Sequence, residues 1–315
     1  MPDSVFQLLS QHTRLEETLK RQNRTYMIYR TNIPTEDRSK SERSAEQIRK
    51  HYLVEKELAA QLRAATKEER RQLYTTLYDE LFRRVPDHPQ LSLKLKAQAD
   101  ARQATLKHRL ALLRKHLRPD VNYLEIGPGD CSLAIEVARL VRKVYAVDVS
   151  HEITKEVELP DNVELIISDG SSVPVPQSSI DLAYSDQLME HLHPDDAIDQ
   201  LRDIYKSLTP GGRYICITPN RLSGPHDVSQ YFDDIATGFH LKEYTLRELS
   251  EIFRSVGFRR TQVLVGARGF QVRVPAILPR IIEFLLEHTG ARFGRNVARR
   301  LPFRLILGIK LVGIK

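Results

Sequence analysis

The segment from Val121 to Cys131, which reads VNYLEIGPGDC, places the strongest constraint on how this chain can fold. Its first half alternates apolar and β-favouring residues, which predicts a buried strand. The sequence Gly127-Pro128-Gly129 then predicts a tight turn, because glycine tolerates positive φ angles and lets the backbone come close to a ligand. Apolar residues at helical spacing follow, so we expect a helix that packs back onto the strand. A strand, a glycine turn and a helix start, in this order, are typical of a nucleotide or nucleoside site at the carboxyl edge of a parallel sheet.

Three residues around this turn narrow the kind of ligand. Cys131 stands where the dinucleotide fingerprint has its third glycine, and Glu125 precedes the turn at a point where it would repel a pyrophosphate. A carboxylate in this place suits a ligand that carries an ammonium or another cation. Asp148 ends the next expected strand, residues 143–147, and stands where an acidic residue holds the hydroxyls of a ribose. These residues leave one alternative open, a plain Rossmann-type domain that binds a different nucleotide or no nucleotide.

Strands and helices then alternate along the chain with short connections. The segments between strands are predicted to be helices from their apolar spacing and from capping signals, such as Thr245-Leu246-Arg247-Glu248 before an amphipathic segment. Further strands are expected at residues 163–168, 180–185, 213–218 and 261–266. This alternation predicts an α/β fold with a doubly wound, mostly parallel sheet.

Two motifs in this part of the chain resemble those of class I S-adenosylmethionine-dependent methyltransferases. The first is Glu125-Ile126-Gly127-Pro128-Gly129 followed by Asp148, and the second is the turn LTPGG, residues 208–212, before the fifth strand. A third likeness, His240 in the sequence HLKEYT, is to the ubiquinone-biosynthesis-like (methyltransferase type 11) branch of that superfamily.

The resemblance covers about residues 110–266 and implies a Rossmann-like sheet of seven strands, the last of them antiparallel and within residues 304–314. It also implies S-adenosylmethionine as the cofactor, with Asp169 on the exocyclic amine of adenine, and with Ser185 and Asp186 beside the methionine part. The cofactor residues expected from the motifs and the resemblance together are Glu125, Gly127, Pro128, Gly129, Asp148, Val149, Asp169, Gly170, Ser185 and Asp186.

Candidate catalytic and substrate residues follow the fourth and fifth strands. A sulfonium methyl is already activated, so its transfer needs chiefly a positioned nucleophile, and a base only where the accepting atom carries a proton of high pKa. His191, past the fourth strand, is the first candidate base. Glu190 and His193 are weaker candidates, expected to turn toward solvent or the next loop, and His193 is also a candidate for substrate contact. The long segment 220–244 adds two candidate bases, His226 and His240, and a candidate substrate contact, Tyr231. A purely structural role is as well supported for each of these three residues.

Residues 1–110 are predicted to be helical, and they form either a cap over the cofactor cleft or a packing or dimerisation layer. The two cysteines, Cys131 and Cys216, stand in no CxxC pattern, so neither disulfides nor a cysteine zinc site is expected, and no metal is assigned. The sequence has no apolar run of about 18 residues and no uninterrupted apolar segment near residue 1. We therefore expect a cytoplasmic protein.

The tail, residues 267–315, carries the whole positive excess of the chain. Residues 268–315 hold ten basic and two acidic side chains, whereas the chain as a whole has a formal net charge of +7. Apolar clusters such as Phe284-Leu285-Leu286 stand between the basic residues. Such a mixture suits peripheral contact with an anionic membrane surface, or a lipid-linked substrate, and the alternative is a helical insertion packed on the sheet. Nucleic acid is not expected as a partner, because the tail lacks recurrent aromatic residues for stacking.

The sequence thus predicts three parts, 1–110, 111–266 and 267–315, and a methyltransferase that acts on a small molecule, a saccharide or a lipid-linked intermediate. We expect in-line transfer to oxygen, because Ser185-Asp186-Gln187-Leu188 is not the Asn/Asp-Pro-Pro-aromatic sequence used for planar nitrogens, and neither cysteine follows a proline. The expected location is the cytoplasm, including the inner face of the membrane. A catalytically silent cofactor-binding scaffold and an RNA methyltransferase whose basic tail contacts RNA both stay open, as does the oligomeric state.

Overall fold

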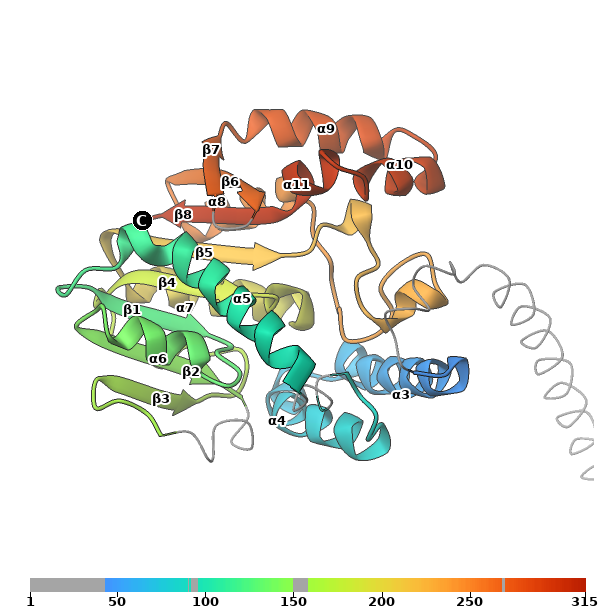
Figure 1. The fold of residues 1–315 in the computed structure, drawn as a ribbon, viewed down its shortest axis with the longest axis horizontal. Helices are drawn as coiled ribbons and strands as arrows, with labels where there is room; N and C mark the ends of the chain where they lie inside the picture. The colour runs from blue at the N-terminus through green and yellow to red at the C-terminus, as the bar shows by residue number, and fades with distance from the viewer. Residues whose placement is uncertain (1–42, 90, 92–95, 150–157, 268–269) are drawn as a thin grey trace, which may run out of the picture. The chain divides into compact units, whose positions relative to one another are not determined.

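The computed structural model describes residues 43–89, 91, 96–149, 158–267 and 270–315 (Figure 1). The chain divides into two units, Met1–Ile48 and Arg49–Lys315. All elements discussed below belong to the second unit, apart from the first residues of helix α3 (Ala45–Ala64). The helical region expected at 1–110 therefore lies within the described residues only from residue 43 onward.

A sheet of eight strands forms the centre of the second unit, in the order β3-β2-β1-β4-β5-β8-β6-β7 (Figure 1). The pairs from β3 to β5 are parallel, and the pairs β5–β8, β8–β6 and β6–β7 are antiparallel. The direction of winding reverses between β1 and β4, which is where a doubly wound sheet opens its cleft. The strands are Asn122–Ile126 (β1), Lys143–Asp148 (β2), Val163–Ile167 (β3), Ile180–Asp186 (β4), Leu208–Thr218 (β5), Arg260–Ala267 (β6), Phe270–Val274 (β7) and Ile309–Ile314 (β8).

The prediction of a doubly wound, mostly parallel sheet is confirmed, but the sheet has eight strands and not seven. The added strand is β7, which falls in the segment predicted as the basic tail. Its residues, FQVRV, alternate apolar and polar side chains, and they pair antiparallel with β6 from Val263 to Ala267. The last strand, β8, is antiparallel to β5 as expected. It begins only at Ile309, because Phe303–Leu307 form the short helix α11.

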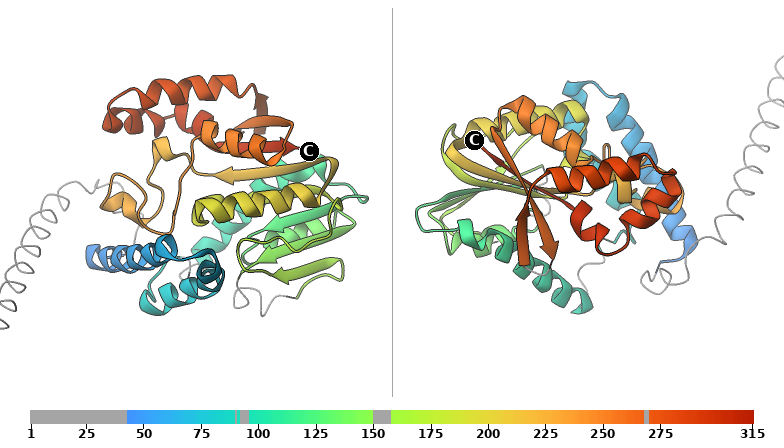
Figure 2. Two further views of the ribbon diagram at one scale, coloured as in Figure 1. Left: turned by 180° about the vertical axis from the view of Figure 1, so that it is seen from behind. Right: turned by 90° about the horizontal axis from the view of Figure 1, so that it is seen from above.

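Two hydrophobic clusters cover the two faces of the sheet, because successive side chains of a strand point to opposite faces. Tyr123 and Ile215 pack on one face with α5 and α6, and Leu124 and Tyr214 pack on the other face with α4, α7 and α8. Figure 1 shows α5 and α6 in front of the sheet, and the view from behind in Figure 2 shows α7 and α8. These helices are α4 (Lys67–Arg84), α5 (Lys96–Leu113), α6 (Ser132–Ala138), α7 (Pro194–Ser207) and α8 (Leu246–Val256).

Helices α3 and α4 connect to the sheet through specific side chains. The capping box that the sequence predicts at the start of α4 is present, with Thr66 and Glu69 each binding the other's backbone N–H group. Arg70 of α4 forms a buried ion pair with Asp196 of α7, with Nη2 and Oδ1 2.8 Å apart. Arg63 of α3 donates to three backbone carbonyl oxygens in the segment after β5, those of Thr237, Gly238 and His240. The two helices therefore hold both α7 and this segment.

The tail contributes β7 and β8 to the sheet and adds the helices α9 (Ile277–Glu287) and α10 (Ala291–Ala298) beside them (Figure 1). Among the described residues, no helix combines the length and the apolar character that crossing a membrane requires.

Candidate active site

The turn between β1 and α6 has the backbone conformation that its glycines predict. Gly127 and Gly129 have φ angles of 70° and 56°, which side chains rarely adopt, and Pro128 between them is buried. A Cβ atom placed on Gly129 would meet nothing within 4 Å, so open space faces the turn. Cys131 also has a positive φ, of 57°, and is buried in the cluster beneath α6. The turn thus offers backbone rather than side chains to a ligand at the carboxyl end of β1.

Asp148, at the end of β2, faces this turn. Its Oδ2 accepts a hydrogen bond from the N–H of Gly129 at 3.2 Å, and its Oδ1 accepts one from the N–H of Val149 at 2.7 Å. Each carboxylate oxygen can accept more than one hydrogen bond, so a ligand hydroxyl can still bind here. The structure brings these three predicted residues together in an arrangement that suits a ribose diol.

Glu125, in β1, is only 3% exposed. Burial raises its pKa to about 8, and the positive charge of Arg109 acts in the opposite direction. Its Oε2 atom has no hydrogen-bond partner among the described residues. A buried polar oxygen without a partner is rare in folded proteins and marks a place for a donor. An ammonium group is such a donor, so this carboxylate fits the amino group of S-adenosylmethionine.

Asp186, at the end of β4, lies close to Glu125, and its charge contributes to the raised pKa of that residue. Its Oδ2 accepts from Nε of Arg109 at 2.7 Å and from the Tyr184 hydroxyl at 3.2 Å. Sequence reasoning missed Arg109, because nothing distinguishes it from the other basic residues of α5. Ser185 points to the opposite face of the sheet, where its hydroxyl lies 2.7 Å from that of Tyr214. The structure does not bring Ser185 to Glu125 and Asp186.

Asp169, after β3, is engaged by its own neighbours and by α4. Its Oδ1 accepts from the backbone and hydroxyl groups of Ser171 and Ser172. Its Oδ2 lies 3.0 Å from Nε of Arg71 in α4. Gly170 has a φ of 84°, and a Cβ atom there would come within 2.8 Å of a tyrosine ring of α4, so glycine lets this helix approach. The contact expected between Asp169 and adenine stays a prediction.

A second group of titratable residues lies past the end of β4 and after β5. Glu190 and His191 belong to the short helix η3 (Met189–His191), and His240 belongs to the segment after β5. Each of the three side chains has one nitrogen or oxygen atom that could bind a metal, and these three atoms lie within 4.8 Å of one another. The two imidazole rings meet edge to face, with their centroids 4.8 Å apart. Glu190 is fully buried. Its Oε2 accepts from the hydroxyl of Thr218 at 2.9 Å, and its Oε1 has no partner among the described residues.

Acceptor groups hold the Nδ1 atoms of both histidines. The Nδ1 of His191 lies 3.1 Å from the carbonyl oxygen of Phe239 and 3.1 Å from the hydroxyl of Tyr78. The Nδ1 of His240 lies 2.7 Å from Oε1 of Glu243. Because carbonyl and carboxylate oxygens accept hydrogen bonds, we assign a proton to Nδ1 of both rings. The Nε2 atom of each neutral ring is then an acceptor.

The members of this group differ in how readily they hold a proton. Burial raises the pKa of Glu190 to about 7, against the charge of His240. Burial, and then the charge of His240, lower the pKa of His191 to about 3. Burial also lowers the pKa of His240, but the hydrogen bond to Glu243 and the charge of Glu190 outweigh it, so this pKa lies above its usual value. His191 therefore stays neutral near neutral pH, whereas His240 holds a proton more readily than a free imidazole.

The remaining predicted residues are His226, His193 and Tyr231. The backbone N–H of His226 donates to Oε1 of Glu243 at 2.7 Å, so this one carboxylate oxygen binds both His226 and His240. His193 caps the amino end of α7, and Tyr231 packs edge-on against Phe232.

Sequence reasoning missed three further residues that shape the group, Glu55, Tyr78 and Glu243. Glu55 is 5% exposed, and its Oε1 accepts from the backbone N–H of Phe239 at 2.8 Å. A signal for it existed, because Glu55 shares the apolar face of its helix with leucines, and a charged residue there is unusual. Glu243 stands three residues after His240, a spacing that offered no comparable signal.

A doubly wound sheet with a glycine turn after β1 and an acidic residue at the end of β2 is typical of proteins that bind a nucleoside-type cofactor. Comparisons with known proteins narrow this class. The model of a family described as "Methyltransferase domain" matches residues 97–263, more than half of the chain.

Curated relatives agree with this match. A protein of Mycolicibacterium smegmatis named "Probable S-adenosylmethionine-dependent methyltransferase" is 28% identical over 136 residues, which are 43% of this chain and 51% of the relative. A protein of the same description from Mycobacterium tuberculosis is 29% identical over 136 residues, 43% of this chain and 47% of the relative. This chain spans about half the length of the curated relatives that it matches. The crystal structure of a SAM-dependent methyltransferase from Archaeoglobus fulgidus aligns with a TM-score of 0.45 at 17% identity, over 67% of this chain and 93% of that one.

The chain therefore belongs to the methyltransferase-domain family. Its curated relatives are named as S-adenosylmethionine-dependent, which agrees with the cofactor that the resemblance in the sequence implied.

Proposed function

We propose that the protein transfers the methyl group of S-adenosylmethionine to a hydroxyl oxygen of a small molecule or saccharide, either free or lipid-linked. The observation that carries this proposal is the buried group of Glu190, His240 and Glu243 at the carboxyl edge of β4 and β5. A hydroxyl loses its proton too reluctantly to attack unaided, so a base held in a buried site favours oxygen as the acceptor atom.

Each residue has a role that follows from its contacts. When bound, S-adenosylmethionine supplies a sulfonium methyl that is open to in-line displacement. Asp148 would hold the ribose hydroxyls, and Glu125 would bind the ammonium group. His240 accepts the proton of the acceptor hydroxyl at Nε2, while Glu243 orients the ring through Nδ1 and stabilises the imidazolium. We assign the base to His240 rather than to His191, because a pKa of about 3 makes His191 a weak base.

Replacing His240 by Asn tests this assignment. Turnover is measured as release of S-adenosylhomocysteine with p-nitrophenyl glycosides and polyprenyl-phosphate-linked saccharides as acceptors, and the affinity for S-adenosylhomocysteine is measured by calorimetry. We expect His240→Asn to lower kcat about 100- to 10,000-fold, as loss of a general base does, with little change in cofactor affinity. His191→Asn serves as the matched control and should retain most of the activity.

A pH profile separates a base from a structural residue. In the wild-type protein kcat should rise through the pKa of His240, which lies above its usual value. Glu243→Gln removes the charge that raises this pKa, so the rise should move to lower pH. If His240→Asn keeps wild-type turnover, the base assignment is wrong. If S-adenosylhomocysteine binds but no acceptor in the panel is methylated, the scaffold alternative gains support.

We further propose that the tail helices place the protein on an anionic membrane surface, as the composition of the tail predicts. Seven of the eleven large apolar side chains that the described residues expose belong to the tail, five on α9, one on α10 and one just after it, each 48–70% exposed, and we refer to them together as the tail surface. This tail surface consists of Ile277, Leu278, Ile281, Phe284, Leu285, Phe293 and Leu301. Apolar residues gathered on adjoining helices, rather than scattered singly, mark a surface that binds another phase or partner.

The charges around the tail surface favour an anionic bilayer as that partner. Arg292, Arg300 and Arg304 are exposed and have no ion pair among the described residues. The acids of α9 are already engaged, because Glu283 is buried against an asparagine and Glu287 pairs with an arginine after β5. A helix pair with exposed apolar and unpaired basic residues suits the interface of an anionic membrane.

The tail helices are joined to the segment that carries His240, which supports a lipid-linked acceptor. Nε of Arg299 donates to the carbonyl oxygen of Ser223 at 2.8 Å, and Nη1 of Arg295 lies 3.0 Å from Oδ1 of Asp234. A protein bound through the tail surface would hold this segment near the lipid headgroups.

Vesicle co-sedimentation tests the membrane proposal. We expect the full chain to bind vesicles containing phosphatidylglycerol and to bind pure phosphatidylcholine vesicles at least about tenfold more weakly, with a loss of binding in high salt. Phe284→Asp should weaken binding strongly. Ile235→Asp is the matched control, since Ile235 is 69% exposed but lies outside the tail surface. Equal binding by both variants and the wild-type protein would contradict the proposal.

A further inference from the structure

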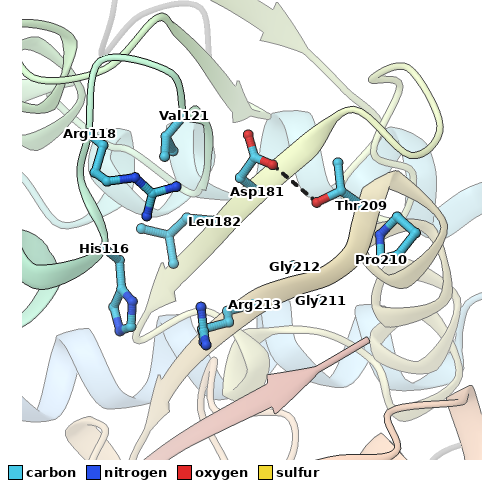
Figure 3. Close-up of a pocket in the computed structure, with 10 residues that line it drawn as sticks. All are labelled: His116, Arg118, Val121, Asp181, Leu182, Thr209, Pro210, Gly211, Gly212 and Arg213. Carbon is cyan, nitrogen blue, oxygen red and sulfur yellow. Dashed lines mark hydrogen bonds between the residues drawn. The ribbon is translucent and has the colours of Figure 1, made fainter.

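A pocket of about 140 Å³ lies at the opposite, amino-terminal edge of the sheet (Figure 3). It is lined by Asp181 and Leu182 at the start of β4, by residues 209–213 of β5, and by His116 and Arg118, which follow α5. Gly129, Asp148 and Glu190 all lie at the other ends of these parallel strands, so the pocket has no part in the candidate active site. Its volume is well below the roughly 300–1,000 Å³ of sites for whole drug-sized ligands, and it suits a single small group.

Basic side chains converge on this pocket. Figure 3 shows the imidazole of His116 and the guanidinium group of Arg213 in the same part of the pocket, with the guanidinium group of Arg118 on the other side of Leu182. Lys115 and Arg273 lie near enough to act on His116. Burial, and then the charges of Arg213, Lys115 and Arg273, lower the pKa of His116 to about 4. Burial and the charges of Arg273 and Arg213 also lower the pKa of Lys115.

Acidic groups among the described residues leave this cluster unbalanced. Arg118 pairs with Asp120 outside the pocket, Nε to Oδ1 at 3.2 Å. Asp181 points toward Thr209 and is occupied, because it accepts from the Thr209 hydroxyl at 3.1 Å and from a backbone N–H of β1 at 2.9 Å (Figure 3). Nε of Arg213 is buried and has no hydrogen-bond partner among the described residues.

This arrangement is unfavourable unless something else binds. Four basic residues (Lys115, Arg118, Arg213 and Arg273) stand here against two carboxylates, Asp120 and Asp181. Like charges that outnumber their counter-ions repel one another, and a buried donor without an acceptor loses its hydration without compensation. One oxyanion between His116 and Arg213 would remove both penalties. Arginine suits it, because the planar guanidinium binds phosphate and carboxylate oxygens in pairs.

We propose that this pocket binds a small oxyanion, a phosphate or phosphate monoester group, between His116 and Arg213. Recognition would rest on the side chains, because the N–H of the pocket residue Gly211 already donates to the backbone oxygen of Lys315 at 3.2 Å. His116, neutral in the free protein, takes up a proton when the anion arrives. The inference goes beyond methyl transfer and does not depend on it.

NMR of the His116 ring tests the proposal in the full chain. The ring protons are assigned with His116→Gln, and their pH titration is recorded with and without millimolar inorganic phosphate at matched ionic strength. We expect phosphate to raise the pKa of His116 by about one unit or more, since an anion favours the charged ring. Arg213→Gln should weaken phosphate binding about tenfold or more, as loss of a charged donor does.

Two controls make the outcome decisive. Arg254→Gln removes the same charge from an exposed position of α8 and should leave phosphate binding and the His116 titration unchanged. Arg213→Gln should also raise Tm in phosphate-free buffer, because it relieves the repulsion in the cluster. This second readout shows that the variant is folded.

The source of the anion is decided by comparing soluble and lipid-bound phosphate. A response of His116 to inorganic phosphate or glycerol 3-phosphate supports a soluble ligand. A response only to vesicles that contain phosphatidic acid supports a lipid headgroup, and both results keep the pocket as an anion site. No change of the His116 titration with any of the three probes would overturn the proposal. An equal loss of binding in Arg254→Gln would do so too.

Discussion

The two regions at the carboxyl edge of the sheet hold their carboxylates in different ways. In the cofactor region, around the turn after β1 and the end of β2, backbone N–H groups of Gly129 and Val149 hold Asp148. In the acceptor region, made of Glu190, His191, His240 and Glu243, titratable side chains hold one another beneath α3 and α4. Backbone donors are fixed by a few consecutive residues, whereas side-chain pairs depend on distant segments and on protonation. The acceptor region should therefore be the more easily damaged of the two.

The largest effect is expected from breaking the anchor of α4, the helix that brings Tyr78 to His191. Arg70 and Asp196 are 5% and 1% exposed, so Asp196→Ala leaves a buried arginine without its partner. Loss of one member of a buried ion pair costs about 3–5 kcal/mol of unfolding free energy. Urea denaturation followed by circular dichroism measures this loss. Glu80→Ala, which removes an exposed pair with Arg83, should cost no more than about 1 kcal/mol.

This variant also tests the difference between the two regions. At temperatures where Asp196→Ala is still folded, turnover should fall more than affinity for S-adenosylhomocysteine, because α4 contacts the acceptor region through Tyr78. An equal loss of both properties would mean that the two regions are not held independently.

The next effect concerns the cofactor region itself. Asp148→Asn keeps the size of the side chain but removes the charge that accepts from the N–H of Gly129 and from the ribose hydroxyls. Hydrogen bonds to charged groups contribute about 1.5–3 kcal/mol each, so affinity for S-adenosylhomocysteine should fall about 100-fold. Calorimetric titration gives this value directly. Glu190→Gln, in the acceptor region, should stay close to the wild-type affinity, and a matching loss there would contradict the assignment of Asp148.

The same contrast explains how much of the molecule could be predicted from its sequence. The turn from Glu125 to Gly129 and the acidic end of β2 are read from consecutive residues, because strand ends and glycine spacing fix their positions. The acceptor region is assembled over long distances in the chain: Tyr78 stands 113 residues before His191, and Glu55 stands 184 residues before Phe239. No local pattern records such pairings. Strand β7 was missed for a related reason, because its five residues form a strand through their pairing with β6.

A smaller effect is expected from pH, and it involves Glu125, the carboxylate in the cofactor region whose Oε2 has no partner among the described residues. Burial raises the pKa of Glu125 to about 8 and that of Glu190 to about 7, both above the roughly 4.3 of an unfolded glutamate. The folded state therefore binds these protons more tightly than the unfolded state. Their contribution to stability is complete below pH 4.3 or so and is lost as the pH rises through about 7 and 8.

His191 changes the unfolding free energy in the opposite sense, because its pKa is lower in the folded state than in the unfolded state. It reduces stability only below the unfolded pKa of about 6.5. Between pH 6.5 and 8 or so, the unfolding free energy should fall by about 2–3 kcal/mol. Glu125→Gln should remove the part of this fall above pH 7. Bound S-adenosylhomocysteine should remove the same part in the wild-type protein, because its ammonium group favours the ionised Glu125. If the ligand leaves the slope unchanged, Glu125 does not bind that group.

The smallest effect is expected from metal removal. Glu190, His191 and His240 offer two imidazoles and a carboxylate within 4.8 Å, a donor set that also suits Zn²⁺. No metal is assigned from the sequence, and the proposed function uses His240 as a base. Dialysis against EDTA should then change kcat by less than about twofold, and added Zn²⁺ should inhibit by occupying Nε2 of His240. If chelation instead abolishes turnover and Zn²⁺ restores it, His240 is a metal ligand and cannot be the base. The acceptor region would then be held by fixed coordination, and its contrast with the cofactor region would disappear.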